Sequence, residues 1–414
     1  MIPHNGSRAL PLEIWEMVIK EVGGPFTGES MVLTVEESLA ERRSPQPSSS
    51  SQSQERLKMR LAVVLTCRQW AWMGIPYLYD ELWFDTKFRK DSLPSILRKT
   101  PATFTKSPRS YGEYVKTVRC PVDDEVGPVS GTFLKALAAL CPNLRALVAP
   151  SINLKSISEW KLVQRSLTDL VHLESLEIGL KWKSAPPTNK TRIGPQTSLT
   201  SVRFLKFHYD TASDLVRCWQ LPVLKELSIQ AVSPEGQGFH PFGYSSQLFK
   251  FIDTYGSRLS ALSITATCFP RSSLCIAGLC RDLTFLSICP WELRSMPISS
   301  HTHEPHRGLQ VVAFHSLSLP QLCVRHSSYH LSPFQELLES ISPQDFPTLV
   351  KIRFSERPDA HRVIDTKACL PAWLKPLMRQ WEECGIVIQE GDRPTSLEKV
   401  AKEFIFEPET DLAH

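Results

Sequence analysis

The sequence predicts an α/β protein in which a short helical module precedes an irregular solenoid of helix–strand repeats. Two observations favour this class. Two N-terminal stretches have apolar residues on both faces of a helix, and one apolar pattern then recurs about every 29 residues on average. Stacked units of this kind place parallel strands on a concave face and helices on a convex face.

Composition excludes several other classes. The 414 residues are 42% hydrophobic and 22% charged, which indicates a globular chain long enough for several domains or one repeat array. The net charge of +4 is spread along the chain without a basic block, so no nucleic acid partner is expected. Short apolar runs and a charged N-terminus predict no membrane partner and no export.

Cysteine usage agrees with an intracellular protein of the cytoplasm and/or nucleus. The 11 cysteines are odd in number, scattered, and mostly placed among apolar neighbours, as expected of free thiols.

The first predicted element is a helix over residues 10–22, "LPLEIWEMVIKEV". Pro11 suits its first position, and Gly23 to Pro25 end it. Its apolar residues form two faces: Leu12, Trp15, Ile19 and Val22 on one, Leu10, Ile14 and Val18 on the other. A disordered insertion is expected around 24–55, because "SPQPSSSSQSQ" at 44–54 has no apolar residue.

The second element covers residues 55–84. We expect a helix that breaks at Gly74 to Pro76, with Pro76 starting a short third helix. This helix again carries two apolar lines: Leu57, Leu61 and Leu65, and Met59, Val63 and Trp70. So small a unit cannot bury both faces by itself, so a partner protein is required.

These residues resemble the F-box of fungal F-box proteins. The resemblance rests on three motifs in order: Leu10, Pro11, Glu13, Ile14, Trp15 and Ile19; then Leu65, Cys67, Arg68 and Trp70; then "PYLYDELWF" from Pro76 to Phe84. It implies an F-box over 1–86 that docks on the Skp-family adaptor of a cullin-RING ubiquitin ligase. The adaptor-binding residues would be Leu10, Pro11, Ile14, Leu61 and Leu65, while Trp15, Ile19 and Trp70 fill the internal core. An ordinary helical cap on the next domain is the alternative.

A pattern of apolar-x-x-apolar-x-apolar follows nine times. The trios are Val115-Val118-Cys120, Leu144-Leu147-Ala149, Leu173-Leu176-Ile178, Val202-Leu205-Phe207, Leu224-Leu227-Ile229, Leu259-Leu262-Ile264, Leu283-Leu286-Ile288, Leu309-Val312-Phe314 and Leu349-Ile352-Phe354. Helically spaced apolar residues lie before several trios, so each unit reads as helix, turn and strand.

These units resemble the leucine-rich repeats that follow many F-boxes, and we assign 87–370 to a degenerate leucine-rich-repeat solenoid. The asparagine that usually bonds successive turns is absent, so the repeats are expected to be irregular. A doubly wound nucleotide-binding fold is less favoured because no Gly-rich phosphate loop follows any strand.

The last elements are a helix containing Leu374, Leu377, Met378 and Trp381, a stop at Gly385 and a strand at 386–389. We assign 371–391 to a helix–strand cap and 392–414 to a tail in which Phe404 to Phe406 can dock.

No catalytic motif, cofactor site or metal site is predicted, so the chain is not expected to be an enzyme. His301, His303 and His306, with Cys275, Cys280 and Cys289 nearby in sequence, suggest zinc, but their spacing fits no structural site. A solvated loop is the favoured interpretation.

Strand residues between the trio positions should point to the opposite face, where aromatic and charged side chains suit protein recognition. The predicted target-binding residues are Glu177, Phe204, Lys206, His208, Phe285, Trp291, His315 and Arg353. The expected function is substrate recognition in a Skp–cullin–F-box (SCF) type ubiquitin ligase, with an unknown protein substrate. The alternative is a leucine-rich-repeat scaffold outside any ligase.

Overall fold

A computed structural model of the chain describes residues 17, 49–66, 68–84, 93–99, 109–120, 129–182, 197–209, 219–231, 251–264, 276–288, 305–315, 332–355, 369–390, 393–396, 398–400 and 405–406. The chain splits into two compact units. Among the described residues, the first unit contains those up to 202 together with 219–222, and the second contains the remainder. The division falls inside the predicted repeat region.

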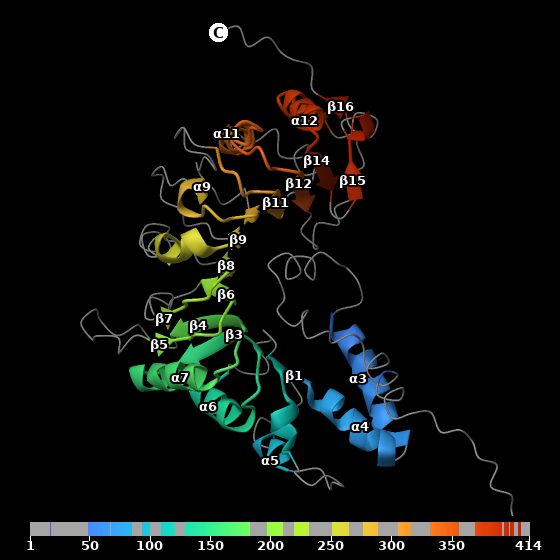
Figure 1. Ribbon diagram of the computed structural model, residues 1–414, viewed down its shortest axis with the longest axis vertical. Coiled ribbons are helices and arrows are strands. Elements are labelled where there is room, and N and C mark those ends of the chain that lie inside the picture. The colour runs from blue at the N-terminus through green and yellow to red at the C-terminus, as the bar shows by residue number, and fades with distance from the viewer. Residues whose placement is uncertain are drawn as a thin grey trace, which may run out of the picture. The chain divides into compact units, whose positions relative to one another are not determined.

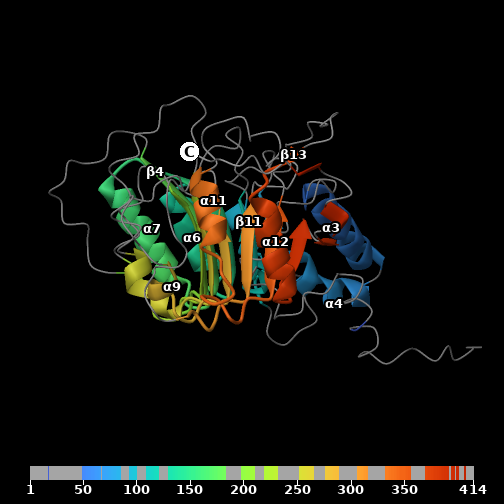
Figure 2. The same ribbon diagram turned by 90° about the horizontal axis from the view of Figure 1, so that it is seen from above.

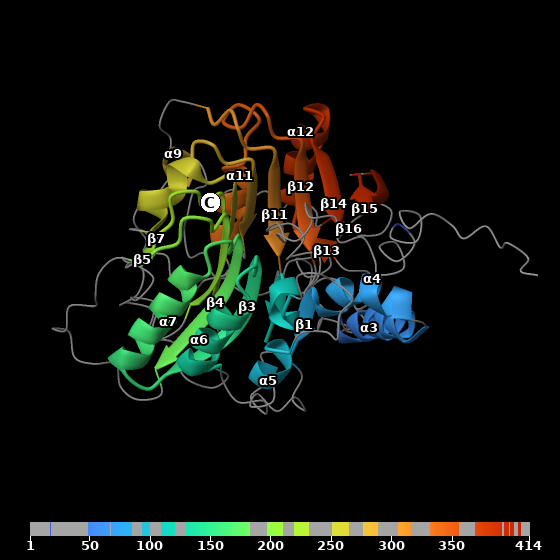
Figure 3. The same cartoon turned by 60° about the horizontal axis from the view of Figure 1, so that its bottom comes forward.

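The first unit combines helices with parallel strands. Its elements are α3 (Ser49–Thr66), α4 (Arg68–Tyr79), β1 (Glu81–Trp83), α5 (Leu93–Leu97), the 3₁₀ helix η1 (Tyr111–Tyr114), β2 (Thr117–Arg119), α6 (Gly131–Leu140), β3 (Ala146–Leu154), α7 (Ile157–Asp169), β4 (Ser175–Trp182), β5 (Thr197–Ser198) and β7 (Trp219–Gln220). Strands β1 to β4 are neighbours in chain order, and all their pairings are parallel. Helices α6 and α7 lie side by side along β3 and β4 (Figures 1 and 3).

The second unit repeats this arrangement. Its elements are β6 (Phe204–Tyr209), β8 (Glu226–Ala231), η4 (Gly256–Arg258), β9 (Ala261–Ile264), α9 (Ile276–Leu279), β10 (Phe285–Ile288), β11 (Val311–His315), α11 (Ser332–Glu339), β12 (Lys351–Ser355), β13 (Cys369–Leu370), α12 (Leu374–Glu383), β14 (Val387–Glu390), β15 (Arg393–Thr395) and β16 (Ile405–Phe406). The strand order is β6-β8-β9-β10-β11-β12-β14-β15, parallel except for the antiparallel β14–β15 pair. Helices α11 and α12 lie next to each other along the strands (Figure 2).

The fold is therefore mixed α/β with a mostly parallel sheet that does not close into a barrel, which confirms the predicted α/β class. Among the described helices, none combines the length and apolar character needed to cross a bilayer.

The strand register aligns the trios of neighbouring strands within each unit. In the first unit Leu147 lies opposite both Val118 and Leu176. In the second unit Leu286 lies opposite both Leu262 and Val312. No side chain of the nine trios is more than 6% exposed. The trios therefore form the core that the apolar pattern predicts, since each repeat buries its apolar residues against the next.

A ladder of main-chain hydrogen bonds links the segments that precede most of the strands, usually at the residue after a trio's first position. The carbonyl group of Lys116 accepts hydrogen bonds from the amides of Arg145 (2.7 Å) and Ala146 (2.9 Å) at the start of the next repeat. The same two-amide arrangement is made by the carbonyls of Asp80, Arg145, Arg203, Lys225, Ser260, Thr284 and Gln310. Main-chain bonds thus connect successive turns in a chain that lacks the usual asparagine.

Local sequence explains where the helices begin and end. The hydroxyl of Ser156 accepts a hydrogen bond from the amide of Glu159 (3.2 Å) and caps α7. Gly385 follows α12 with a φ of 77°, and the amide of Ile386 donates to the carbonyl of Trp381 (2.9 Å). This is a Schellman ending, which favours glycine, and it confirms the predicted stop. The predicted C-terminal helix and strand are α12 and β14.

The N-terminal module differs from the prediction in three ways. Helix α3 begins at Ser49, so 49–54 are helical although the polar composition predicted a loop. Helix α4 runs through Gly74 and contains Pro76 instead of breaking there. The expected third helix is absent from this stretch, and Glu81–Trp83 forms β1, because pairing with β2 satisfies its backbone.

Candidate functional site

Helices α3 and α4 pack against each other and share a small core (Figure 1). Val63 and Met73 are buried, and Trp70 and Tyr77 pack against them. The internal position predicted for Trp70 is confirmed. Gly74 allows the close approach, since a Cβ there would lie 2.8 Å from a methyl carbon of Val64.

The other face of α3 carries exposed leucines. Leu57, Leu61 and Leu65 are 50%, 44% and 73% exposed, and their i, i+4, i+8 spacing places them on one line. We call these three residues the leucine stripe. Leu61 and Leu65 are the predicted adaptor-binding residues that the structure describes. Leu10, Pro11 and Ile14, and the predicted core residues Trp15 and Ile19, lie outside the described residues.

Most of the predicted target-binding side chains are buried. The exposed fractions of Phe204, Lys206, His208, Phe285 and Arg353 are 2%, 5%, 8%, 7% and 7%, so the expectation that they face solvent is wrong. Parallel strands are commonly covered on both faces. The register aligns Lys206 and Arg353 in one row across the strands of the second unit. The positions between them hold small residues, which are Ser228, Ser263, Ser287 and Ala313. These four residues are at most 1% exposed, so this row of the strands is closed to solvent.

The same residues do not form one cluster. Lys206 on β6 and Arg353 on β12 are five strand steps apart, or about 24 Å at the usual strand spacing. Arg353 instead donates from Nε to the side-chain oxygen of Gln389 (3.0 Å). His315 lies on β11, where the register pairs it with Ser355, and Trp291 lies outside the described residues.

Glu177 lies in the first unit, where the equivalent row is more accessible. Register places Trp83, Arg119, Val148 and Glu177 side by side on four neighbouring strands. Trp83 is 40% exposed, and the Arg119 guanidinium lies 5.2 Å from the centre of its ring. Arg119 Nε also binds the carboxylate of Glu81 at 2.9 Å. Glu177 thus lies at one end of a partly exposed row, with Val148 between it and Arg119.

His306, the one described histidine of the predicted solvated loop, is buried instead of solvated. His306 is 8% exposed. Its Nδ1 accepts from the amides of Gly308 (3.3 Å) and Leu309 (3.0 Å), so its Nε2 carries the proton and donates to the Cys280 carbonyl (2.9 Å). His301, His303, Cys275 and Cys289 lie outside the described residues. Within the described ranges, no group of three His, Cys, Asp or Glu side chains is placed to hold a metal.

A polar hollow of about 410 Å³ in the first unit was not predicted. Its lining comes from α4, from η1 and the residues before it, and from the turns that precede β2, β3 and β4. The lining residues are Pro76, Arg109, Glu113, Tyr114, Lys116, Asn143, Arg145 and His172. Lys116 and Arg145 occupy the same ladder position in successive repeats. In the sequence, Lys116 and Arg145 each follow the first residue of a trio, and these two basic residues at equivalent positions could have indicated this site.

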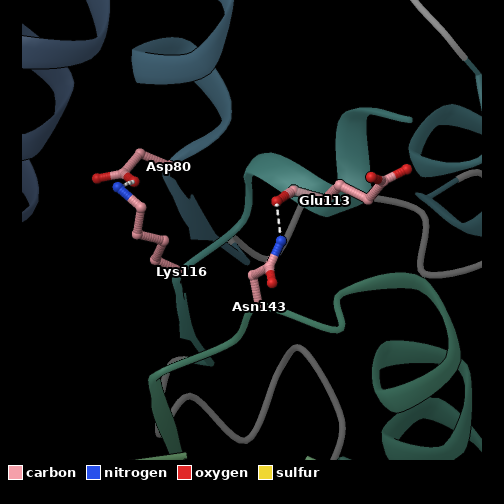
Figure 4. Close-up of polar contacts among 4 residues, drawn as sticks. All are labelled: Asp80, Glu113, Lys116 and Asn143. Atoms are coloured by element: carbon pink, nitrogen blue, oxygen red, sulfur yellow. Dashed lines mark hydrogen bonds and ion pairs between the residues drawn. The ribbon is translucent and has the colours of Figure 1, made fainter. Parts of the chain in front are cut away.

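Hydrogen bonds order the wall of the hollow (Figure 4). The amide nitrogen of Asn143 donates to the Glu113 carbonyl (2.7 Å). The Glu113 carboxylate points away from Asn143 and accepts from the amide (2.9 Å) and hydroxyl (3.1 Å) of Ser110. The Lys116 ammonium binds the Asp80 carboxylate at 2.7 Å.

Asp80 is an unfavourable place for a negative charge. Its side chain is 3% exposed, and burial raises the pKa of this carboxyl, although the hydrogen bond and charge of Lys116 oppose the shift. One carboxylate oxygen, Oδ2, has no hydrogen-bond partner among the described residues. Lys116 therefore pairs with a carboxylate whose charged form is disfavoured by burial.

Comparison with known proteins adds no relative: no family model matches the chain, and no curated protein matches it.

Proposed function

We propose that this chain is the substrate-recognition subunit of an SCF-type ubiquitin ligase, in which an N-terminal F-box binds a Skp-family adaptor. The leucine stripe on α3 carries the proposal. Exposed apolar side chains on one helical line are costly in water, at about 25 cal/mol for each Å² of apolar surface. The neighbouring face of the helix pair is already used by the core of Val63 and Met73. A protein partner that covers the stripe removes that cost.

We propose that the α/β fold of the remaining chain is a leucine-rich-repeat solenoid. Its support is the alignment of trios in neighbouring strands and the ladder of main-chain bonds. In this view the repeats present a protein target to the ligase, and other subunits perform the chemistry. The chain contributes proximity.

Target contacts are best placed on the first unit. Glu177 and the neighbouring Trp83 and Arg119 are accessible, whereas Phe204 and Phe285 are buried. Tryptophan and arginine dominate the energetics of protein interfaces. We therefore propose Trp83, Arg119 and Glu177 as the target-binding group, with Glu177 the one member that the sequence identified.

Capture of a purified Skp-family adaptor tests the adaptor assignment. Leu61→Ala and Leu65→Ala should each weaken binding about tenfold, because each removes apolar area that the adaptor would bury. Val171→Ala is the matched control, since Val171 is 59% exposed in the same unit but outside α3. Melting curves should show all three variants folded.

Equal capture by the double variant Leu61→Ala/Leu65→Ala and the control would contradict the F-box assignment. Co-purification of a cullin with the adaptor separates the ligase from the competing possibility. A chain that binds targets without adaptor or cullin is a repeat scaffold.

A further inference from the structure

We propose that the hollow beside η1 is a binding site for a phosphate monoester. Its lining brings the side chains of Arg109, Lys116 and Arg145 to one concave surface of about 410 Å³, with Tyr114 and His172 as further polar groups. This volume is within the range of small-ligand sites. The proposal does not depend on adaptor binding, because no residue of the leucine stripe lines the hollow.

Two of the three positive charges at the site, those of Arg109 and Arg145, are available to a ligand. Arg109 makes no ion pair with any described residue. Arg145 approaches Glu174 only at 3.9 Å, with 45% and 31% of the two side chains exposed, and such surface pairs hold their partners weakly. Two guanidinium groups can each present paired N–H donors to phosphate oxygens, which is the geometry that favours arginine at phosphate sites.

The negative groups nearby leave Arg109 and Arg145 open to a ligand, while Asp80 shares the Lys116 ammonium at 2.7 Å. The Glu113 carboxylate faces away from Asn143 and is bonded to Ser110 (Figure 4). The Glu113 carbonyl, which could repel an anion, already accepts the Asn143 amide. Asp80 is buried and is absent from the lining. An incoming dianion would find the guanidinium groups of Arg109 and Arg145 and the side chain of Tyr114 in the lining of the hollow.

Phosphate is favoured over a carboxylate by the number of cations. Two guanidinium groups, together with the Lys116 ammonium that Asp80 shares, come from three separate segments and can surround a group with about two negative charges and three acceptor oxygens. A single carboxylate has one charge and two oxygens, so it would leave part of this lining unused. The phosphate can be carried by a phosphorylated side chain of a polypeptide or by a small free phosphoester.

Calorimetric titration of the full chain with three probes tests the site: inorganic phosphate, a short phosphoserine peptide, and the same peptide with glutamate replacing phosphoserine. The phosphoserine peptide should bind at least tenfold more tightly than the glutamate peptide, and binding should weaken as salt is added. If the peptide binds much more tightly than inorganic phosphate, the ligand is a phosphorylated polypeptide. Similar affinities indicate a free phosphoester.

Arg109→Gln and Arg145→Gln should each weaken phosphate binding about tenfold, as expected for loss of a charge-assisted contact. Arg203→Gln is the matched control, because Arg203 occupies the same ladder position as Arg145 but does not line the hollow. The proposal is overturned if neither phosphate probe binds at millimolar concentration, if the glutamate peptide binds equally well, or if the two variants match Arg203→Gln. Adaptor capture should be unaffected by Arg145→Gln, so the two proposals fail separately.

Discussion

His306 joins two successive turns of the second unit through both nitrogens of its ring. Such a residue looks like a metal ligand in the sequence, because histidines and cysteines are close together there. In the structure both nitrogens already have protein partners. This use of a buried histidine as a hydrogen-bonding bridge depends on the turn before β10, which sequence spacing does not reveal.

Replacing His306 should lower the stability of the protein. In His306→Ala the Cys280 carbonyl and the amide of Leu309 lose a buried partner, which costs about 1–3 kcal/mol in the free energy of unfolding. Urea unfolding measures this loss. His172→Ala, at an exposed histidine, should change the free energy by less than about 0.5 kcal/mol. Equal stability of the two variants would show that the bridge contributes nothing.

The thiol of Cys141 should make stability depend on pH in the alkaline range. Cys141 is fully buried, and desolvation raises its pKa from 9.0 to about 12. Because the folded-state pKa is the higher one, the contribution is complete below pH 9 and is lost as pH rises toward 12. The free energy of unfolding should fall by about 1.4 kcal/mol per pH unit in that window.

Unfolding curves of the wild type and Cys141→Ala at pH 8, 9 and 10 test this contribution. The variant should lack the additional slope, whereas Cys384→Ala, at an exposed thiol, should keep it. Parallel pH profiles for Cys141→Ala and the wild type would contradict the burial argument.

The strands show how one sequence pattern can predict one face of an element and miss the other. Apolar residues at the trio positions identify the inward face of each strand, and these residues are the core. The polar and aromatic residues between them suggest an open face. In the second unit that face is buried as well, since Lys206, Ser263 and Arg353 are at most 7% exposed.

Phe204→Ala should therefore destabilise the protein and not simply remove a binding contact. Phe204 is 2% exposed on β6, and truncating a buried phenylalanine costs about 3–5 kcal/mol. Thermal unfolding measures the effect, with Val223→Ala as a control at a 39% exposed position. A variant with an unchanged melting temperature would restore the interpretation of Phe204 as a surface contact.

At the scale of the whole molecule, the chain divides into two compact units, and the division falls inside the region that the sequence predicts to be repeats. The boundary falls after Val202, the first residue of the fourth trio. The first unit contains α3 and α4, the accessible row at Trp83 and the hollow. The residues for all three proposed contacts therefore belong to one unit, while the second unit contains the longer run of strands.

Sequence alone determined the class of fold, the position of the strands that carry the trios, and the core that the trios form. Apolar periodicity reports which side chains must leave water, and the trios, α12 and its Gly385 ending follow from that local chemistry. It also identified the apolar line on α3, because helical spacing is visible in the chain itself. The tertiary structure decided which of the remaining residues are accessible. The buried second face, the His306 bridge and the basic hollow all depend on segments that are distant in sequence and adjacent in space, and exposure is a property of that packing.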